Sequence, residues 1–194
     1  MESFKTVKDR VETKLNVERS LFITNLAPVE DERRAKEFVT EVSKKYRDAT
    51  HNCYAYRVLS KSNLVEFCSD AGEPAGTAGL PILNTLRRYQ LVNVAVVVSR
   101  YFGGVKLGVR GLIEAYAKSA EEAVVKASIV EKHKAYKYRL RLDFTEYGKR
   151  MNQLQRLGAV VTNITYLEDH VLLEILSFSD LNLPNAEETE VVYI

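Results

Sequence analysis

Tryptophan is absent from the 194 residues, and there are only two cysteines. Two cysteines are too few for a disulfide framework or a four-cysteine metal site, which argues against a disulfide-stapled domain and a zinc ribbon. No apolar run approaches the roughly 20 residues of a membrane-spanning helix. The charged start of the chain also lacks the apolar stretch of a signal peptide. We therefore expect a cytoplasmic protein without membrane segments, cofactors or metals.

Neither positive nor negative charge is in large excess, because the formal net charge is only +2. The charges are unevenly spread, however. Residues 132–156 hold eight basic and two acidic side chains, whereas residues 168–194 hold seven acidic side chains and no lysine or arginine. This balance neither requires nor excludes a nucleic-acid partner. A solvated surface is the ordinary interpretation, and the basic stretch 132–141 is the candidate for an added nucleic-acid contact.

Hydrophobic periodicity predicts eight elements in the first 130 residues. The predicted strands are 11–17, 21–26, 51–59, 64–68 and 94–99. The predicted helices are 31–47, a helix starting near 80, and 112–127. The strand 94–99 is continuously apolar and β-branched, which is typical of an interior strand. This order of elements predicts a mixed α+β layer.

The pattern starts again after residue 130. Alternation predicts a strand over 136–144, a helical stripe predicts a helix over 147–157, and two further strands are expected over 159–167 and 171–178. This order is three-quarters of a ferredoxin-like module, and the last sixteen residues show no clear second helix. We expect an α+β protein with an N-terminal domain, 1–132, and an incomplete ferredoxin-like C-terminal domain, 133–194.

The segment 70–79 is rich in glycine and proline and is expected to be a loop. Its backbone amides could form an anion nest at the start of a helix, with contacts from Asp70, Glu73, Gly76 and Thr77. It is not a P-loop, because the lysine and hydroxyl pair is missing after Gly76. The two acids would repel a phosphate unless a metal or an arginine intervened. A structural turn is the competing and favoured interpretation.

A second glycine-rich segment, RYFGGVKLGVRG, follows the interior strand and opens a helix. Its candidate binding residues are Arg100, Tyr101, Phe102, Gly103, Gly104, Lys106 and Arg110. Basic residues beside aromatic ones recur in proteins that bind single-stranded nucleic acids. The alternative is that the aromatic residues are core and the glycines only turn the chain. Composition leaves these two interpretations even.

A cysteine–histidine catalytic pair is not favoured. His51 and Cys53 share a strand face but are separated by roughly 6–7 Å along it, so a buried structural Cys53 is the better interpretation. The zinc-protease and nucleophile-elbow motifs are also absent. The residues therefore leave enzymatic activity uncertain and weigh against it, with no catalytic residue indicated.

Three strings carry a resemblance to a known family: HNCYAYR (51–57), SDAGEPAGTAGLPIL (69–83) and VVVSRYFGGVKLG (96–108). Together they resemble the IMPACT/YigZ family. The resemblance implies an N-terminal domain like the second domain of ribosomal small-subunit protein five. It also implies a C-terminal ferredoxin-like domain similar to domain V of elongation factor G. Eukaryotic relatives are translational regulators that act through a protein partner by means of a different N-terminal domain.

The leading hypothesis is a non-enzymatic, translation-associated protein that binds RNA or the ribosome. Its surface would combine basic and aromatic residues, namely Arg57, Arg100, Tyr101, Phe102, Lys106 and Arg110. The rival hypothesis is an enzyme or sensor that holds a phosphate-bearing ligand or a nucleotide between the two glycine-rich loops. In that case Asp70 and Glu73 would act as acid and base or hold a cation. A third hypothesis is a protein–protein module, for example with a partner in translation control.

Overall fold

The computed structural model describes residues 1–60, 63–183 and 186–194. It divides into two compact units, one formed by Phe4–Glu131 and the other by Lys132–Ile194 together with Met1–Ser3. The fold is mixed α+β, as the order of elements predicted. The grouping of the first three residues with the C-terminal unit differs from the expected division at 132. It follows from hydrogen bonding, because the amide of Lys134 donates to the Glu2 carbonyl at 2.7 Å.

The N-terminal unit is built on a five-stranded antiparallel sheet in the order β2-β3-β6-β4-β5. Its strands are β2 (Val11–Val17), β3 (Ser20–Pro28), β4 (His51–Ser60), β5 (Asn63–Ser69) and β6 (Val94–Tyr101). The central strand β6 pairs with both β3 and β4 and is buried over Val94–Arg100. Burial on both faces explains its uninterrupted apolar sequence.

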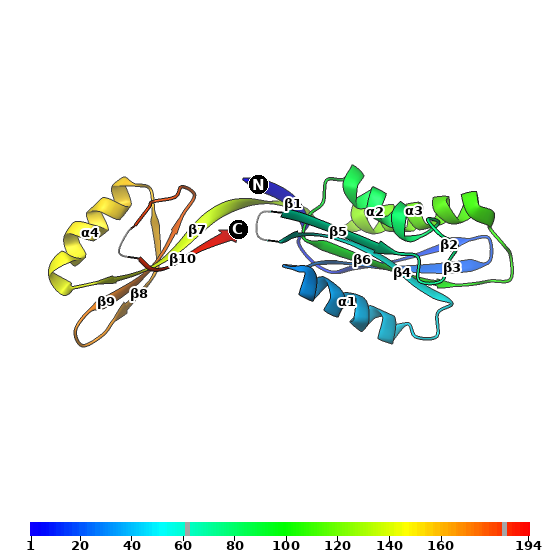
Figure 1. Cartoon of the computed structure of the whole chain (residues 1–194), viewed down its shortest axis with the longest axis horizontal. Coiled ribbons are helices and arrows are strands. Elements are labelled where there is room, and N and C mark those ends of the chain that lie inside the picture. Colours follow the sequence, from blue (N-terminus) through cyan, green and yellow to red (C-terminus); the bar gives the residue numbers. More distant parts are fainter. Residues whose placement is uncertain (61–62, 184–185) are drawn as a thin grey trace. The chain divides into compact units, whose positions relative to one another are not determined.

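Helices cover both faces of this sheet, as Figure 1 shows. The helix α1 (Glu32–Lys45) covers one face, and α2 (Gly79–Arg88) and α3 (Gly108–Lys126) cover the other. Alternate residues of β6 serve the two cores, so that Val97 packs with α1 and Val96 packs with α2 and α3. The helix α3 begins four residues earlier than predicted, at Gly108, because the glycines around Arg110 gave its first turn the composition of a loop.

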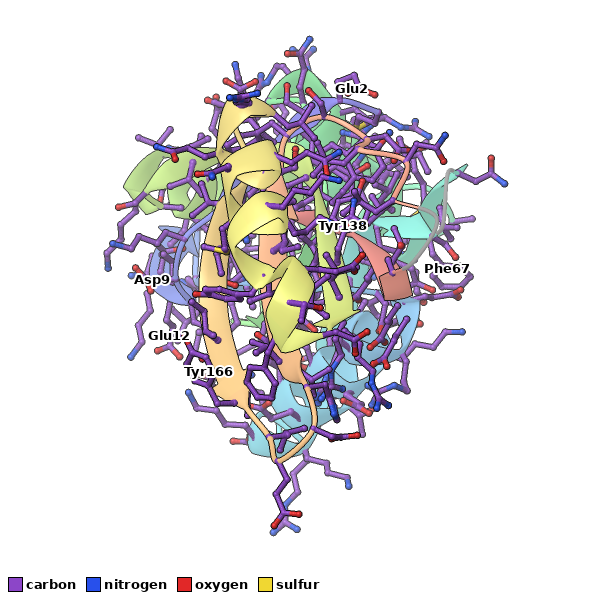
Figure 2. The ribbon with its side chains drawn as sticks, turned by 90° about the vertical axis from the view of Figure 1, so that its left-hand side faces the viewer. Glu2, Asp9, Glu12, Phe67, Tyr138 and Tyr166 are labelled. Carbon is purple, nitrogen blue, oxygen red and sulfur yellow. The ribbon has the colours of Figure 1, made fainter. Side chains whose placement is uncertain are left out.

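The C-terminal unit has the antiparallel strand order β10-β7-β9-β8, with α4 on one face. Figure 2 shows α4 in front of strands β8 and β9. The elements are β7 (Ile129–Leu142), α4 (Phe144–Arg156), β8 (Val160–Tyr166), β9 (Val171–Ser177) and β10 (Ala186–Tyr193). This is the strand order of a ferredoxin-like sheet. Between β9 and β10 the described residues contain no second helix.

Two strands were not predicted. The strand β1 (Ser3–Val7) pairs with β7 and is too short to show a clear alternation. The strand β10 is rich in glutamate, which is uncommon in strands. The glutamates of β10 face basic residues, because Glu188 lies opposite Arg139 of β7 and Glu190 lies opposite Lys137. Opposite charges across neighbouring strands stabilise a sheet.

This pairing also corrects the expectation of a basic surface over 132–141. On its other side β7 pairs with β9, where Glu174 lies opposite Arg139 and 3.8 Å from the ammonium group of Lys137. The basic strand is therefore flanked by acidic side chains on both sides. Within this sheet, Lys137 and Arg139 therefore lie opposite acidic residues rather than forming an isolated basic row. Separately, none of the described helices is long and apolar enough to cross a membrane.

Substitution of Leu154 provides a test of the packing in the C-terminal core. Its side chain is 1% exposed where α4 packs on the sheet. Replacing Leu154 by Ala should lower the free energy of unfolding by about 2–5 kcal/mol, because the lost contacts leave a cavity. Leu157, which is 47% exposed, is the matched control and should tolerate alanine. Urea denaturation followed by far-ultraviolet circular dichroism measures both, and equal effects of the two changes would contradict this packing.

Candidate functional site

The three motif strings meet at one end of the N-terminal sheet. His51 begins β4 and lies opposite Arg100, which is near the end of β6. The loop 70–79 follows β5, whose last residue, Ser69, lies opposite Tyr54 of β4. The second glycine-rich loop continues from the end of β6 into α3. Segments far apart in the sequence therefore reach one end of the sheet because β4 pairs with both β5 and β6.

Asp70 organises the first loop from within. Its carboxylate accepts hydrogen bonds from the backbone amides of Gly76 (2.8 Å), Ala78 (2.9 Å) and Gly79 (2.8 Å). The last two amides belong to the start of α2, so Asp70 caps that helix. The buried hydroxyl of Thr77 donates to the Pro74 carbonyl at 2.7 Å. The loop is thus closed by its own side chains.

This arrangement corrects the expectation of a phosphate nest in the loop. The three amides that would face a phosphate face the Asp70 carboxylate instead. Burial raises the pKa of Asp70, but the three amide hydrogen bonds together outweigh it and hold that pKa below its usual range. Asp70 therefore stays ionised and keeps its place in the nest at neutral pH.

Glu73 and Arg100 form a buried ion pair beneath the loop. The Arg100 guanidinium donates to Glu73 Oε1 at 2.7 Å, and the two side chains are only 6% and 4% exposed. Tyr116 of α3 donates its hydroxyl to the same carboxylate oxygen at 2.8 Å. Arg100 also donates to the Ser20 hydroxyl at 3.3 Å. The pair therefore connects β3, β6, the first loop and α3.

The rings of Phe22 and Phe102 lie near the Arg100 guanidinium, with centroids 5.5 and 5.4 Å from its central carbon. Cation–π attraction adds to the ion pair in such an arrangement. Arg100 was expected to contact phosphates from an exposed surface, and the structure corrects this expectation. Its charge is already balanced by Glu73 and is shielded from solvent.

Arg57 is also removed from the expected surface. It lies six residues after His51 on β4, about 20 Å along the strand, at the opposite end of the sheet. Its guanidinium donates to Glu66 at 2.7 Å and to the Leu91 carbonyl at 2.9 Å. Arg57 therefore ties β4 to β5 and to the end of α2.

His51 and Cys53 belong to the same network but do not form a catalytic pair. His51 Nδ1 lies 3.0 Å from the Ala71 carbonyl, and Nε2 lies 4.0 Å from Glu73. The Cys53 thiol donates to the Asp70 carbonyl at 2.8 Å. Burial raises the pKa of Cys53 to about 12, so it is a thiol at neutral pH. The prediction of a buried Cys53 is confirmed.

The second loop presents its remaining side chains outward. Phe102 is 45% exposed, and Lys106 and Arg110 are exposed, with Arg110 in an ion pair with Glu114 at 2.8 Å. Tyr101 points to the opposite sheet face, where its hydroxyl donates to Asp48 at 2.9 Å. The exposed members of the predicted surface are therefore Phe102, Lys106 and Arg110.

Two glycines make this loop geometry accessible. A Cβ on Gly103 would lie 1.7 Å from the Arg19 carbonyl oxygen, so only glycine fits where the loop crosses the start of β3. Gly104 has a φ of +87°, which L side chains rarely adopt. Both glycines are among the candidate binding residues of this loop, and both are needed for its path past Arg19.

Two members of the network were not found from the sequence. Tyr116 falls within the predicted helix 112–127, and Ser20 falls between the predicted strands 11–17 and 21–26. Each is fully buried and bonds to a charged partner, Tyr116 to Glu73 and Ser20 to Arg100. Their partners lie 43 and 80 residues away, so no local pattern signals them. Within the described residues no group of three or more metal-ligating side chains comes together.

Comparison of the sequence with known proteins shows which family it resembles. The Impact N-terminal domain matches residues 18–124, more than half of the chain and all three motif strings. The IMPACT family member YvyE of Bacillus subtilis is 38% identical over 169 residues, which are 87% of this chain and 77% of that protein. The chain belongs to the IMPACT family.

Solved structures add to the comparison. A crystal structure described only as that of a hypothetical protein matches with a TM-score of 0.68 and 31% identity. It covers 91% of this chain and 86% of the other. The two-domain translational regulator Yih1 matches with 28% identity and a TM-score of 0.38, over 63% of this chain and 46% of that one. In this chain the three motif strings contribute to one buried network beneath two loops.

The buried ion pair yields the first test of this site. Glu73→Ala leaves the Arg100 charge buried and unpaired, which should lower the free energy of unfolding by about 3–5 kcal/mol. The double variant Glu73→Ala/Arg100→Met should be more stable than Glu73→Ala alone, because the orphaned charge is removed. Glu114→Ala, which breaks the exposed pair with Arg110, should leave the urea midpoint unchanged. A double variant no more stable than the single one would contradict the pairing.

Asp70 yields a test in pH. Its folded-state pKa is depressed, so the stability it contributes is present above its unfolded pKa of about 3.9 and is lost as the pH falls through the folded pKa. Asp70→Asn should lower stability at pH 7 and flatten the loss of stability below pH about 4. Urea midpoints measured for both proteins from neutral to acid pH test this. Parallel curves for the two proteins would show that Asp70 is not the titrating cap.

Proposed function

We propose that this protein acts in translation as a non-enzymatic protein that binds RNA or the ribosome through its second glycine-rich loop. Translation is the setting that the family resemblance implies. The observation that carries the proposal is the loop itself. It leaves an interior strand at a sterically fixed angle and exposes an aromatic ring, Phe102, together with the cation Lys106.

The chemistry of these two side chains fits single-stranded RNA. A half-exposed aromatic ring can stack on an unpaired base, and stacking tolerates any base. An exposed lysine can contact a phosphate and release its counterions. Gly104, which is exposed and has no atom near its Cβ position, leaves room for the backbone of a ligand beside the ring. Arg110 adds a second positive charge near Lys106 when its ion pair with Glu114 opens.

The rival hypothesis of a phosphate-bearing ligand between the loops has less support. The amides of the first loop already hold the Asp70 carboxylate. Glu73 and Arg100 neutralise one another in a buried pair rather than facing a shared space. The side chains that remain exposed are Phe102, Lys106 and Arg110, and this combination of an aromatic ring with cations suits a polymeric ligand that lies on the surface.

Fluorescence anisotropy with a labelled single-stranded RNA, measured at two salt concentrations, tests this proposal. Phe102→Ala should weaken binding by about 5- to 150-fold, the range expected for loss of one stacked base. Lys106→Ala should weaken binding and reduce the slope of affinity against salt by about 0.7, because one phosphate contact is lost.

Phe67→Ala is the matched control for Phe102→Ala. Phe67 is 47% exposed but lies on β5, outside the loop, so its removal should leave RNA affinity unchanged. Ribosome co-sedimentation with the same variants extends the test to the assembled particle. The proposal fails if wild-type protein shows no salt-sensitive RNA binding and no co-sedimentation, or if Phe67→Ala and Phe102→Ala behave alike.

A further inference from the structure

The strand β5 forms one edge of the N-terminal sheet, since β4 is its only partner among the described strands (Figure 1). The outward N–H and C=O groups of an edge strand can pair with another chain, and proteins commonly blunt such edges with charge. The other edge, β2, carries two charged residues, and Lys126 donates to its Glu12 carbonyl at 3.1 Å. The strand β5 carries one, Glu66, and its Leu64 and Phe67 are 38% and 47% exposed. Of the two edges, β5 is therefore the open one.

The pairing of the sheet fixes which main-chain groups of β5 point outward, because these groups alternate sides along an antiparallel strand. The Val29 amide donates to the Asn93 carbonyl, in the register that joins β3 to β6. The next residue, Val94 of β6, therefore faces β4, where it lies opposite Arg57. Arg57 pairs with β6 in this way, so the main-chain groups of Glu66, opposite it on β5, point outward. By the same alternation the outward residues of β5 are Leu64, Glu66 and Cys68.

These outward groups are complementary to those of an identical strand. In an antiparallel pairing of two β5 strands centred on Glu66, Leu64 of each copy lies opposite Cys68 of the other. All three outward residues then form hydrogen-bonded pairs, with about six main-chain hydrogen bonds in total. Pairings centred on Val65 or Phe67 bring only two of the three residues opposite one another. An identical strand therefore matches this edge in length, direction and register.

The side chains on the α1 face of β5 fit the same register. Val65 of each copy lies opposite Phe67 of the other, and pairs of an aromatic with a β-branched residue stabilise neighbouring strands. The Phe67 ring stacks on Tyr56 and Tyr54 within its own chain, with centroids 5.5 and 6.0 Å apart. This stacking already orders the ring, so that less side-chain entropy is lost when it becomes buried.

The charge on the other face is compensated within each copy. The register sets Glu66 opposite Glu66, and like charges directly opposite one another destabilise a sheet. Each Glu66 carboxylate, however, accepts from Arg57 at 2.7 Å and from Arg87 at 2.5 Å. Two arginines accompany each glutamate at the junction, which offsets the repulsion between the two carboxylates.

We propose that β5 pairs with β5 of a second copy of this chain, antiparallel and centred on Glu66, and joins two five-stranded sheets into one. RNA fits this edge less well, because β5 contains no lysine or arginine for a phosphate. The pairing uses none of the exposed side chains of the second glycine-rich loop, so it is independent of RNA binding there.

Leu64→Cys tests the register by cross-linking. Residues in a hydrogen-bonded antiparallel pair have Cα atoms about 5.5 Å apart, which suits a disulfide. Diamide takes up the two hydrogens that are lost when the new thiol and Cys68 of the other copy form that bond. A dimer should appear on a non-reducing gel and return to monomer with dithiothreitol. Within one chain the two positions lie about 13 Å apart along β5, too far to be linked.

Two matched controls accompany the cross-link. Leu64→Cys/Cys68→Ser lacks the second thiol and should remain monomeric after diamide treatment. Val125→Cys places a thiol on α3 at a site that is 69% exposed and away from β5, and it should also remain monomeric. Cross-linking of Val125→Cys to the same extent as Leu64→Cys would show random collision and would contradict the register.

Sedimentation velocity measures the association without a cross-link. The unmodified chain, studied over about a hundredfold range of concentration, should show a reversible equilibrium between monomer and dimer. Leu64→Pro removes one outward N–H from each copy, as an edge strand tolerates, and should weaken the dimer at least about fivefold. Asn16→Pro is the matched control, because Asn16 holds an outward position on the other edge strand and is exposed. Phe67→Ala should weaken the dimer as well, and circular dichroism checks that each variant is folded.

Three results would overturn the inference. A chain that stays monomeric at every concentration would leave this edge to an extended segment of a different protein. Equal association of folded Leu64→Pro and Asn16→Pro would separate the dimer from β5. Loss of RNA binding in Leu64→Pro would assign the edge to RNA. Phe102→Ala should leave the dimer unchanged, so failure of the RNA proposal and failure of this one are distinguishable.

Discussion

The buried ion pair between Glu73 and Arg100 holds together the end of the N-terminal sheet at which the three motif strings meet. Charges are costly to bury, and this pair is held by direct contact between the two side chains and by hydrogen bonds from or to neighbouring hydroxyl groups. Tyr116, Ser20 and the two phenylalanine rings complete the surroundings of Arg100 and Glu73. Removal of either charge would leave the other buried without an ion-pair partner.

Both glycine-rich loops are fixed by this interaction. The first loop contributes Glu73 and is closed by Asp70, whose carboxylate holds the start of α2. The second loop leaves β6 after Tyr101, one residue beyond Arg100, and passes over Arg19 at Gly103. The polar side chains of the motifs therefore stabilise the structure, and Phe102 and Lys106 are the exposed side chains that we propose for binding.

Much of the fold could be predicted from the sequence because its signals are local. The run Val94–Ser99 indicated an interior strand, and β6 is buried between two layers of helices. The motif strings likewise indicated the family. The role of Arg100 could not be predicted, because a charged residue beside aromatic residues looks the same whether it faces solvent or a buried acid. The role of Asp70 could not be predicted either, because only the folded loop turns the amides of Gly76, Ala78 and Gly79 toward its carboxylate. Strand β10 depends on opposite charges in β7, almost fifty residues earlier, and its own composition argues against a strand.

The central claim is that one buried pair holds both loops, and amide hydrogen exchange in Glu73→Gln tests it most directly. The neutral amide keeps the shape of the side chain but removes the charge that balances Arg100. The account predicts faster exchange at Ala78 and Gly79 in the first loop and at Phe102 in the second, with the amides of the C-terminal unit unchanged. Faster exchange in the first loop alone, with Phe102 as protected as in the wild type, would contradict it.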